Sequence, residues 1–409
     1  MTGRAKRRID DLGRFGGEPF FEAPRHVGQL NFPEWDRFRA GMQGIFDRRF
    51  FTNHGPKVRE LEERLADHLG VRHAVCMTNG TLALMVAARA LELTGSVAVP
   101  AFTFIATVQA LSWAGLDPVF CDVDPDTHNI SARTVREAMS DEVSAILGVH
   151  LWGRPCPVDE LSALASERGI RLFFDAAHAV GCSLDGRMIG GFGDVEVFSM
   201  HATKVLNSAE GGFATTDDDG LADALRTIRN FHTTETFIKA PLRINAKMSE
   251  AQAVMGLLSL EDLPRNCRRN AELYGLYREW LGGLPGLGVV AFDEREANNH
   301  QYLIVDVDAD KAGLSRNDIV LLLEGERVLA RRYFTPGAHR SPPYRDDFPQ
   351  YTDALPVTDR LSEQLLQLPL GEGITAGDVE GICGLIRFFV ENAGAIRPRL
   401  KGGRQEETA

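Results

Sequence analysis

The sequence lacks the marks of a membrane protein, a disulfide-rich secreted protein and a general nucleic-acid-binding protein. No apolar run approaches the roughly 18 residues that a bilayer-spanning helix requires. The six cysteines form no Cys-x-x-Cys pair and several lie in apolar strand-like runs, so we expect reduced core cysteines and no zinc site. A net charge of −12 argues against a broad nucleic-acid surface. The basic segment Met1–Arg8 is not followed by an apolar stretch, so we expect no signal peptide and a cytoplasmic protein.

Two motifs that would indicate other chemistry are incomplete. The segment Asp122–Asp126 starts like a calcium loop, but Thr127 stands where that loop needs glycine, and no glutamate follows at its twelfth position. The segment Gly186–Gly193 lacks the G-x-G-x-x-G order of a dinucleotide-binding loop. The sequence therefore argues against a calcium-binding loop and against a dehydrogenase.

The order of the apolar runs predicts an α/β fold with a mostly parallel sheet. Short runs rich in Val, Ile and Phe alternate with amphipathic segments of about ten residues, as in a sheet covered on both faces. The expected strands are Ala74–Met77, Val97–Val99, Pro118–Val123, Ala145–Val149, Arg171–Phe174, Val195–Phe198 and Gly212–Thr216. The expected helices are Lys57–Gly70, Leu82–Leu93, Ala106–Trp113, Ala132–Met139 and Val158–Arg168.

The 409 residues, 44% of them hydrophobic, are enough for one large core and a smaller domain. We expect an N-terminal arm (1–25), a large domain (26–260), a small C-terminal α/β domain (261–395) and a flexible tail (396–409). The amphipathic segment Ser249–Tyr277 should carry the chain out of the large domain. Small-domain strands are expected at Tyr302–Val307 and Arg327–Tyr333, and helices at Ser315–Leu323 and Ala376–Ala393. The tail from Arg397 is charged and lacks core residues, which predicts disorder.

Two strand ends carry a lysine and an aspartate that suit pyridoxal phosphate chemistry. Lys204 follows the strand Val195–Phe198, and Asp175 follows the strand Arg171–Phe174. A lysine amine forms an imine with the cofactor aldehyde, and a carboxylate holds a proton on the pyridine nitrogen. An ion pair at about 4 Å is worth roughly 4 kcal/mol at an effective dielectric of about 20, enough to keep that nitrogen protonated. The alternatives, for each residue alone, are a surface lysine and a helix-capping aspartate.

Further polar and aromatic groups follow other strand ends. Gly80 and Thr81 begin a helix, whose N-terminus can bind a phosphate, and Ser199 can add a hydroxyl. Phe104 can stack on the pyridine ring, and His178 can donate to the cofactor's phenolic oxygen. Taken singly, Thr81 could be a helix cap, Phe104 a core aromatic and His178 a structural histidine. Their joint order favours a site, because ligands of open α/β sheets bind outside the carboxyl ends of the strands.

Together these motifs resemble the DegT/DnrJ/EryC1/StrS sugar aminotransferases, pyridoxal phosphate enzymes of the aspartate aminotransferase fold. The matching stretches are Gly55–Glu60, Asn79–Leu84, Phe102–Thr107, Asp122–Thr127, Asp175–His178, Gly191–Asp194, Phe198–Gly212 and Asn245–Glu250. The resemblance implies a large domain of fold type I, with a mostly parallel sheet, and a small C-terminal α/β domain. It is strong from about residue 30 to about residue 260 and weaker to about residue 390.

The resemblance implies a role for each candidate residue. Lys204 is the lysine that carries the cofactor, Asp175 the partner of the ring nitrogen and Phe104 the stacking ring; Gly80, Thr81 and Ser199 are phosphate ligands. Asn245 is implied to reach the cofactor phosphate of a neighbouring subunit, which makes the active unit a homodimer. Two residues depart from the family pattern, since His178 stands where glutamine is more common and His201 where many members have an aromatic residue. The lysine at position 204 also differs from the deoxysugar dehydratases, which have histidine there.

The implied reaction transfers an amino group from L-glutamate to a nucleotide-linked ketosugar. The resemblance of His201–Lys204 and Glu210–Gly212 to one branch favours the 4-keto position of a dTDP-4-keto-6-deoxy sugar. The open alternatives are a 3-keto-sugar or amino-cyclitol aminotransferase and a non-catalytic regulatory protein that binds pyridoxal phosphate.

Overall fold

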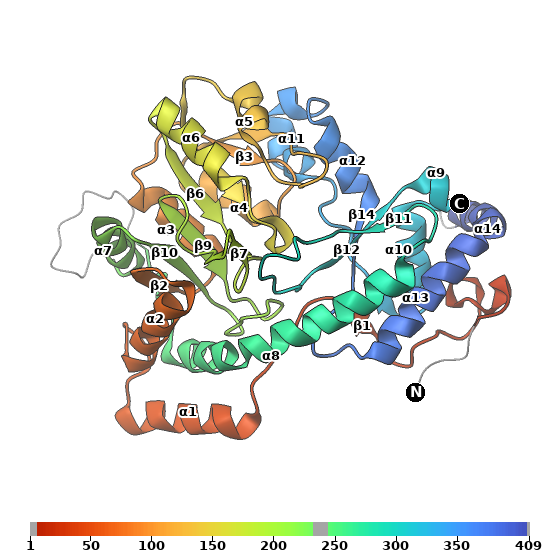
Figure 1. The fold of residues 1–409 in the computed structure, drawn as a ribbon, viewed down its shortest axis with the longest axis horizontal. Coiled ribbons are helices and arrows are strands. Elements are labelled where there is room, and N and C mark those ends of the chain that lie inside the picture. Colours follow the sequence, from red (N-terminus) through yellow and green to blue (C-terminus); the bar gives the residue numbers. More distant parts are fainter. Residues whose placement is uncertain (1–5, 232–243, 407–409) are drawn as a thin grey trace.

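A seven-stranded sheet forms the centre of the large domain (Figure 1). The computed structural model of the chain describes residues 6–231 and 244–406. From one edge to the other, the strands are β2 (His73–Met77), β10 (Gly212–Thr216), β9 (Val195–Ser199), β6 (Arg171–Asp175), β5 (Val143–Val149), β3 (Ser96–Pro100) and β4 (Asp117–Cys121). β10 is antiparallel to both of its neighbours, and all other neighbouring strands are parallel. The predicted α/β fold with a mostly parallel sheet is confirmed.

Helices cover both faces of this sheet, because successive strand side chains point to opposite faces. Val75 and Met77 of β2 pack with α3 (Gly80–Ala90), α4 (Ile105–Trp113) and α7 (Asp219–Arg229). Ala74 and Cys76 of the same strand pack with α2 (Pro56–Leu69) and the start of α8 (Glu250–Leu281). A third cluster, next to β3 and β5, includes side chains of α5 (Ala132–Ala138) and α6 (Val158–Arg168). With both faces covered, the carboxyl ends of the strands remain for a ligand site.

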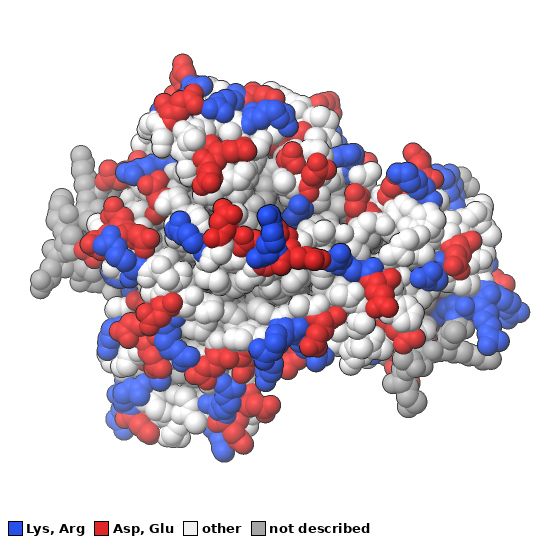
Figure 2. Space-filling model, viewed as in Figure 1, with Lys and Arg blue, Asp and Glu red and all other residues white. Residues whose placement is uncertain are grey.

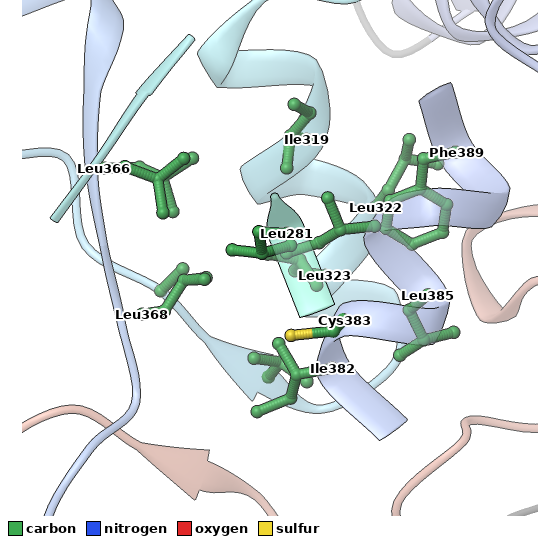
Figure 3. Close-up of a cluster of buried hydrophobic side chains, with 14 of the residues drawn as sticks. Leu281, Ile319, Leu322, Leu323, Leu366, Leu368, Ile382, Cys383, Leu385 and Phe389 are labelled. Carbon is green, nitrogen blue, oxygen red and sulfur yellow. The ribbon is translucent and has the colours of Figure 1, made fainter. Parts of the chain in front are cut away.

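The long helix α8 links the large domain to the small one, contacting α2 in the first and α13 (Ala376–Glu391) in the second. The predicted domain limit at residues 260 and 261 falls within this helix and stays a prediction. The small sheet has the order β11 (Leu287–Val289), β12 (Leu303–Val307), β14 (Leu365–Leu368). Figure 3 shows its core, in which Leu322 of α10 (Arg316–Gly325) lies beside Phe389 of α13, and Leu366 and Leu368 of β14 belong to the same cluster.

The predicted strand Arg327–Tyr333 is mostly not a strand. The only strand in it is β13 (Val328–Leu329), which pairs with the short β1 (Arg25–His26) near the N-terminus, and Arg331 adds a single antiparallel bridge to Gln367 of β14. The chain then continues into a loop in which the Tyr333 ring stacks on Phe334. The Phe334 ring contacts the rings of Phe102 and Trp152 in the large domain, at centre-to-centre distances of 5.5 and 5.3 Å, so this loop packs between the domains instead of extending a sheet.

Both chain ends pack on the small domain. Glu326 accepts hydrogen bonds from the backbone N–H groups of Gly13 and Phe20, at 2.7 and 2.6 Å, which fastens the predicted arm. The prediction of a disordered tail is wrong for the described residues, since α14 runs from Ala393 to Glu406. Ile396 and Leu400, four positions apart, are both buried in the small-domain core. Residues 407–409 of the predicted tail lie outside the described residues.

The chain's charged side chains are mixed in sign on the face shown in Figure 2, where basic and acidic groups alternate over short distances. In the parts of the chain that the structure describes, no helix has both the length and the apolar composition needed to cross a membrane. The same residues contain no group of three or more His, Cys, Asp or Glu side chains suited to a metal ion.

Asp122 ties the sheet to α12 (Pro356–Gln364). Its carboxylate accepts hydrogen bonds from the backbone N–H groups of Val357 and Thr358, at 3.0 and 2.8 Å, and from the Thr358 hydroxyl at 2.8 Å. We expect Asp122→Ala to lower the free energy of unfolding by about 1–2 kcal/mol, as for the loss of a helix cap, measured by urea denaturation. Asp126 is exposed in the segment that follows Asp122, so Asp126→Ala should change the free energy of unfolding by less than about 0.5 kcal/mol. Equal effects of the two variants would refute the capping role.

Candidate active site

The predicted residues meet at one cavity, which has a volume of about 450 Å³ and lies at the carboxyl ends of β6 and β9. Its lining includes Gly80, Thr81, Phe104, Asp175, His178, Ser199 and Lys204. Asn245 is the exception, since it is exposed, pairs with Asn230 in a β-bridge and does not line this cavity. The structure thus brings together side chains from distant strand ends, and the roles assigned to them stay predictions.

Lys204 is half-buried, unlike an ordinary surface lysine. Its backbone N–H donates to the carbonyl oxygen of His201 at 2.8 Å, which closes a tight turn after β9. Its Nζ lies 2.9 Å from the hydroxyl oxygen of Tyr302 and donates to it. Desolvation lowers the pKa of the Lys204 amine to about 8, although the nearby Asp175 carboxylate opposes this effect. An amine with this pKa can accept a proton at mildly alkaline pH.

Asp175 is a buried carboxylate, 7% exposed, with two hydrogen bonds. One oxygen accepts from the Thr107 hydroxyl at 2.8 Å and the other from the Ala177 N–H at 3.0 Å. No helix begins after Asp175, so the helix-capping alternative is wrong. Burial raises the pKa of this carboxyl above its ordinary value, although the two hydrogen bonds oppose the shift. Among the described residues Asp175 has no ion pair, and a cationic ring nitrogen would supply one.

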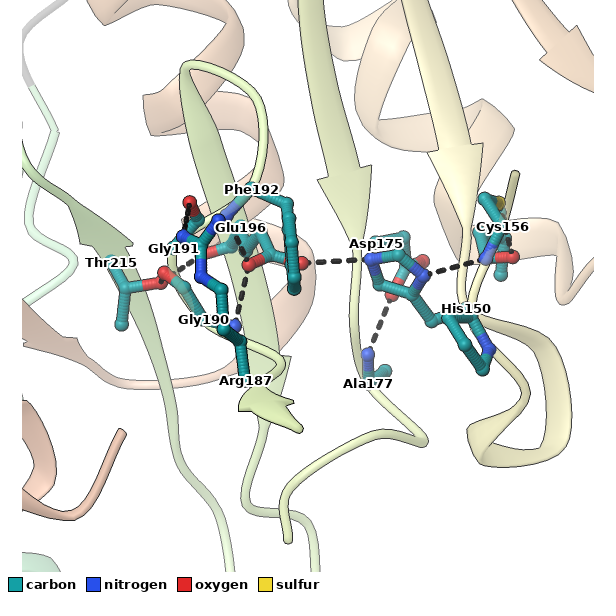
Figure 4. Close-up of polar contacts among 12 residues, drawn as sticks. His150, Cys156, Asp175, Ala177, Arg187, Gly190, Gly191, Phe192, Glu196 and Thr215 are labelled. Carbon is teal, nitrogen blue, oxygen red and sulfur yellow. Dashed lines mark hydrogen bonds and ion pairs between the residues drawn. The ribbon is translucent and has the colours of Figure 1, made fainter. Parts of the chain in front are cut away.

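A buried polar network holds the strand end that carries Asp175 (Figure 4). The backbone N–H of His150 donates to the carbonyl oxygen of Asp175 at 3.0 Å. The Nε2 atom of the His150 ring lies 2.7 Å from a carboxylate oxygen of Glu196. His150 Nδ1 accepts from the Cys156 N–H at 3.0 Å, so Nε2 carries the proton that is donated to Glu196. Both side chains are fully buried, with 0% exposed surface. This network, which the sequence analysis missed, fixes the backbone beside the carboxylate.

The start of α3 offers a cradle for a phosphate. Asn79 caps the helix, because its side-chain oxygen accepts from the Leu82 N–H at 2.8 Å; Thr81 is not the cap. The first N–H groups of a helix have no intrahelical acceptor, so those of Gly80 and Thr81 can bind an anion. A Cβ atom at position 80 would lie 3.2 Å from the Cβ atom of Ser199. Glycine therefore keeps the space between the helix and Ser199 open.

The position of His178 suits a hydrogen-bond donor to a ligand, and that of Phe104 suits a ring that stacks on one. His178 Nδ1 accepts from the Trp152 N–H at 3.2 Å, which leaves its proton on Nε2. Burial and the nearby Lys204 charge hold the pKa of His178 well below its usual range, so the ring stays neutral and can donate through Nε2. Phe104 is 53% exposed at the start of α4 and lines the cavity, so it is not a core aromatic.

The small domain contributes cavity residues that the sequence analysis missed, namely Tyr302, Arg331, Tyr333 and Phe334. Gln301, next to Tyr302, forms hydrogen bonds with the loop that follows Asp175 and with the turn that carries Lys204. Its Nε2 donates to the carbonyl oxygen of His178 at 2.7 Å, and its Oε1 accepts from the Val205 N–H at 3.1 Å. The one sequence feature that marks this part of the cavity lining is the basic and aromatic run Arg331–Phe334. No local pattern placed it opposite Lys204.

The residues present fit pyridoxal phosphate. One cavity combines open helix N–H groups for a phosphate, a buried carboxylate that lacks a cation and an amine with a lowered pKa. A neutral histidine donor completes the set of groups that such a ring requires.

Known proteins are similar to this chain over most of its length. Residues 36–387 match the model of the DegT/DnrJ/EryC1/StrS aminotransferase family. The dTDP-4-amino-4,6-dideoxy-D-glucose transaminase of Escherichia coli is 33% identical over 346 residues, which are 84% of this chain and 93% of that protein. The crystal structure of DesI in the presence of its TDP-sugar product matches with a TM-score of 0.93 and 44% identity, covering 96% of this chain and 100% of that chain.

A relative that acts on another sugar carbon is also similar. The UDP-N-acetyl-3-dehydro-alpha-D-glucosamine 3-aminotransferase of Acidithiobacillus ferrooxidans is 31% identical over 375 residues, which are 90% of this chain and 97% of that protein. The fold and the family are therefore shared by enzymes named for different carbons of different nucleotide sugars.

Proposed function

The chain belongs to the DegT/DnrJ/EryC1/StrS aminotransferase family, which depends on pyridoxal phosphate, and we propose that it aminates C4 of a dTDP-4-keto-6-deoxy sugar with L-glutamate as amino donor. The observation that carries the proposal is the match to DesI, 44% identical over 96% of the chain, whose structure was determined with a TDP-sugar product. The E. coli relative, named for a 4-amino-4,6-dideoxy sugar, points to the same carbon.

In the proposed reaction, the site residues have separate roles. When bound, pyridoxal phosphate supplies a protonated ring that withdraws electrons from the carbon that loses a proton. Asp175 holds the proton on the ring nitrogen, and His178 Nε2 donates to the phenolic oxygen. Lys204 takes the proton from the α-carbon of glutamate and, in the second half of the reaction, delivers one to the sugar. Gly80, Thr81 and Ser199 hold the phosphate at the start of α3.

We expect the half-reaction with saturating glutamate to accelerate with rising pH and to level off above about pH 8. The Lys204 amine must be neutral to accept a proton, and its pKa of about 8 leaves it mostly protonated below that pH. The rate should therefore rise about tenfold per pH unit on the acidic side. Stopped-flow absorbance of the bound cofactor gives the profile. A break near 10.5, the ordinary lysine value, would contradict the assignment.

One experiment distinguishes the proposed function from the alternative functions. The similarity to the Acidithiobacillus 3-aminotransferase favours a 3-keto sugar as the second candidate. The enzyme is incubated with glutamate and a panel of dTDP-4-keto, dTDP-3-keto and UDP-3-keto sugars and a keto-cyclitol, and the products are identified by mass and NMR. A purely regulatory protein would hold the cofactor but would not convert it with glutamate. Amination of a 3-keto sugar or of the cyclitol alone would replace the C4 proposal.

A homodimer is part of the same proposal. Aromatic side chains on and beside α1 (Trp35–Arg48) are exposed in the single chain, among them Trp35 at 68% and Phe46 at 59%. Asn245 lies outside its own chain's cavity, which supports a role for it at the cavity of a second copy. Sedimentation equilibrium of the holoenzyme should give twice the chain mass of 45.0 kDa; a monomer that aminates the sugar at full rate would contradict this arrangement.

The proposed location is the cytoplasm. All six cysteines are free, and five of them are buried. Thiols in this state suit a reducing compartment.

A further inference from the structure

Residues 27–31, called the strap below, lie between the turn that carries Lys204 and the small domain. They connect β1 to α1. The structure describes all five residues, none of which belongs to a helix or a strand. Connecting segments usually run over the protein surface, but Gln29 in the middle of this one is 0% exposed. Burial of such a residue indicates that its contacts matter.

The strap holds the backbone on both sides of Lys204. The backbone N–H of Gln29 donates to the carbonyl oxygen of Thr203 at 3.1 Å. The side-chain amide of Asn31, which is 5% exposed, donates to the carbonyl oxygen of Val205 at 3.4 Å. Lys204 lies between these two anchored carbonyl groups. The strap therefore fixes the direction in which the lysine side chain leaves the turn.

Gln29 is also bound to the small domain. Its Nε2 donates to the carbonyl oxygens of Gln301 and Leu370, at 3.0 and 3.3 Å. Its own carbonyl oxygen accepts from the Glu372 N–H at 3.3 Å. Two carbonyl acceptors on one side determine which end of the Gln29 amide carries the nitrogen. Gln29 thus joins the Lys204 turn to two separate segments of the small domain.

Two glycines allow the strap to approach both neighbours closely. Gly28 has a φ of +104°, and a Cβ atom there would lie 3.0 Å from Cγ2 of Thr203. Gly371 has a φ of +137°, and a Cβ atom there would lie 2.9 Å from Cα of Gln29. Both conditions favour a residue without a side chain. The strap is therefore enclosed between the Lys204 turn and a small-domain loop.

We propose that Gln29 is a positioning residue for Lys204, which it holds so that the amine stays 2.9 Å from the Tyr302 hydroxyl. The inference rests on the proposed function, in which Lys204 carries the cofactor and moves the proton. A displacement of about 1 Å in an active site can cost about 100-fold in rate. Gln29 does not line the cavity, so its loss should slow the chemical step and leave glutamate binding unchanged.

The alternative role of Gln29 is only to fasten the N-terminal arm. Arg25, four residues earlier, fastens the same arm, because its Nε donates to the Asp378 carboxylate of α13 at 2.8 Å. Its backbone N–H donates to the carbonyl oxygen of Arg327 at 2.8 Å, away from the Lys204 turn. Arg25→Gln is therefore a matched control that loosens the arm without removing a contact of the turn.

The half-reaction of the holoenzyme with glutamate is the first test. Gln29→Met keeps the length of the side chain but removes the donor to the small domain. Stopped-flow absorbance over a range of glutamate concentrations should show a maximum rate lowered by about tenfold or more. The half-saturating glutamate concentration should stay within about twofold of wild type. Arg25→Gln should keep both values within about twofold, whatever its effect on thermal unfolding.

A second readout uses the cofactor-free protein. Trace acetylation with acetic anhydride at a series of pH values, followed by peptide mass analysis, gives the pKa of the Lys204 amine. In the wild type we expect about 8, because the amine is desolvated. A looser turn in Gln29→Met exposes the amine to water, so its pKa should rise towards the ordinary value of 10.5. Arg25→Gln should keep the wild-type profile.

Other results would overturn the assignment. A maximum rate of Gln29→Met within about twofold of wild type, an equal loss in Arg25→Gln, or an unchanged acetylation profile would each do so. Should Gln29→Met not fold, Gly28→Ala, which displaces the strap from Thr203 and keeps the Gln29 amide, decides by the same comparison. A wild-type enzyme that does not convert its cofactor with glutamate would instead defeat the proposed function, and the acetylation series would still test Gln29.

Discussion

Lys204→Ala is expected to lower kcat by about 10⁴-fold or more, because one side chain both carries the cofactor and moves the proton. The Lys204 amine lies in the cavity with its pKa lowered to about 8, so it can serve as a base, and the described lining offers no second lysine. Release of 2-oxoglutarate from glutamate in the presence of the ketosugar measures turnover. Borohydride treatment followed by peptide mass analysis should find the cofactor fixed to the peptide with Lys204 in the wild type and absent from it in the variant.

Lys311→Ala is a suitable control for the loss of a lysine. Its side chain is 74% exposed on the small domain and pairs with Asp308 at 2.7 Å, so turnover should stay near the wild-type rate. Multiple turnovers by Lys204→Ala at an unchanged rate would show that another group acts as the base. Binding of the cofactor at another peptide would show that the covalent site lies elsewhere.

Asp175→Asn should slow the half-reaction with glutamate by about 10³-fold, because an amide cannot hold the positive charge on the ring nitrogen. An ion pair at about 4 Å contributes roughly 4 kcal/mol at an effective dielectric of about 20, which corresponds to about three powers of ten in rate. The asparagine side chain has nearly the same size, so the bond from Thr107, 2.8 Å in the parent, can be kept. Stopped-flow absorbance gives the rate, and thermal unfolding confirms that the variant folds.

A modified cofactor supplies the control for Asp175. N-Methylated pyridoxal phosphate carries a fixed positive charge on the ring nitrogen, so Asp175→Asn should recover a large part of its lost rate with it. The wild type should gain nothing, because its carboxylate already holds the charge. A normal rate for Asp175→Asn, or no recovery with the methylated cofactor, would remove Asp175 from this role.

The parts of the site that could be predicted were those that depend on local sequence. Asp175 and Lys204 each follow an apolar strand, and the strands of a parallel sheet all present their carboxyl ends at one edge. Tyr302 lies 98 positions from Lys204 and comes from the small domain. Its place opposite the amine depends on how α8 and the small domain pack, and no local pattern encodes that.

The helix α14 was missed for a different reason. Its charged and glycine-containing composition indicated disorder, and Pro398 inside it argued against a helix. Ile396 and Leu400 nevertheless have the spacing of one helix face, and both are buried against the small domain. Packing of this short apolar stripe outweighed the unfavourable composition.

The two hydrogen bonds of Gln301 have a consequence for a catalyst that must host two unlike molecules in succession. A neutral amide does not titrate, so the link between the His178 carbonyl and the Val205 N–H persists at every pH at which Lys204 changes its charge. Swinging the small domain away as a hinge would break both bonds at once. Any movement of this kind between the two half-reactions therefore carries the free-energy cost of both bonds, which favours exchange of the amino acid for the sugar nucleotide without separation of the domains.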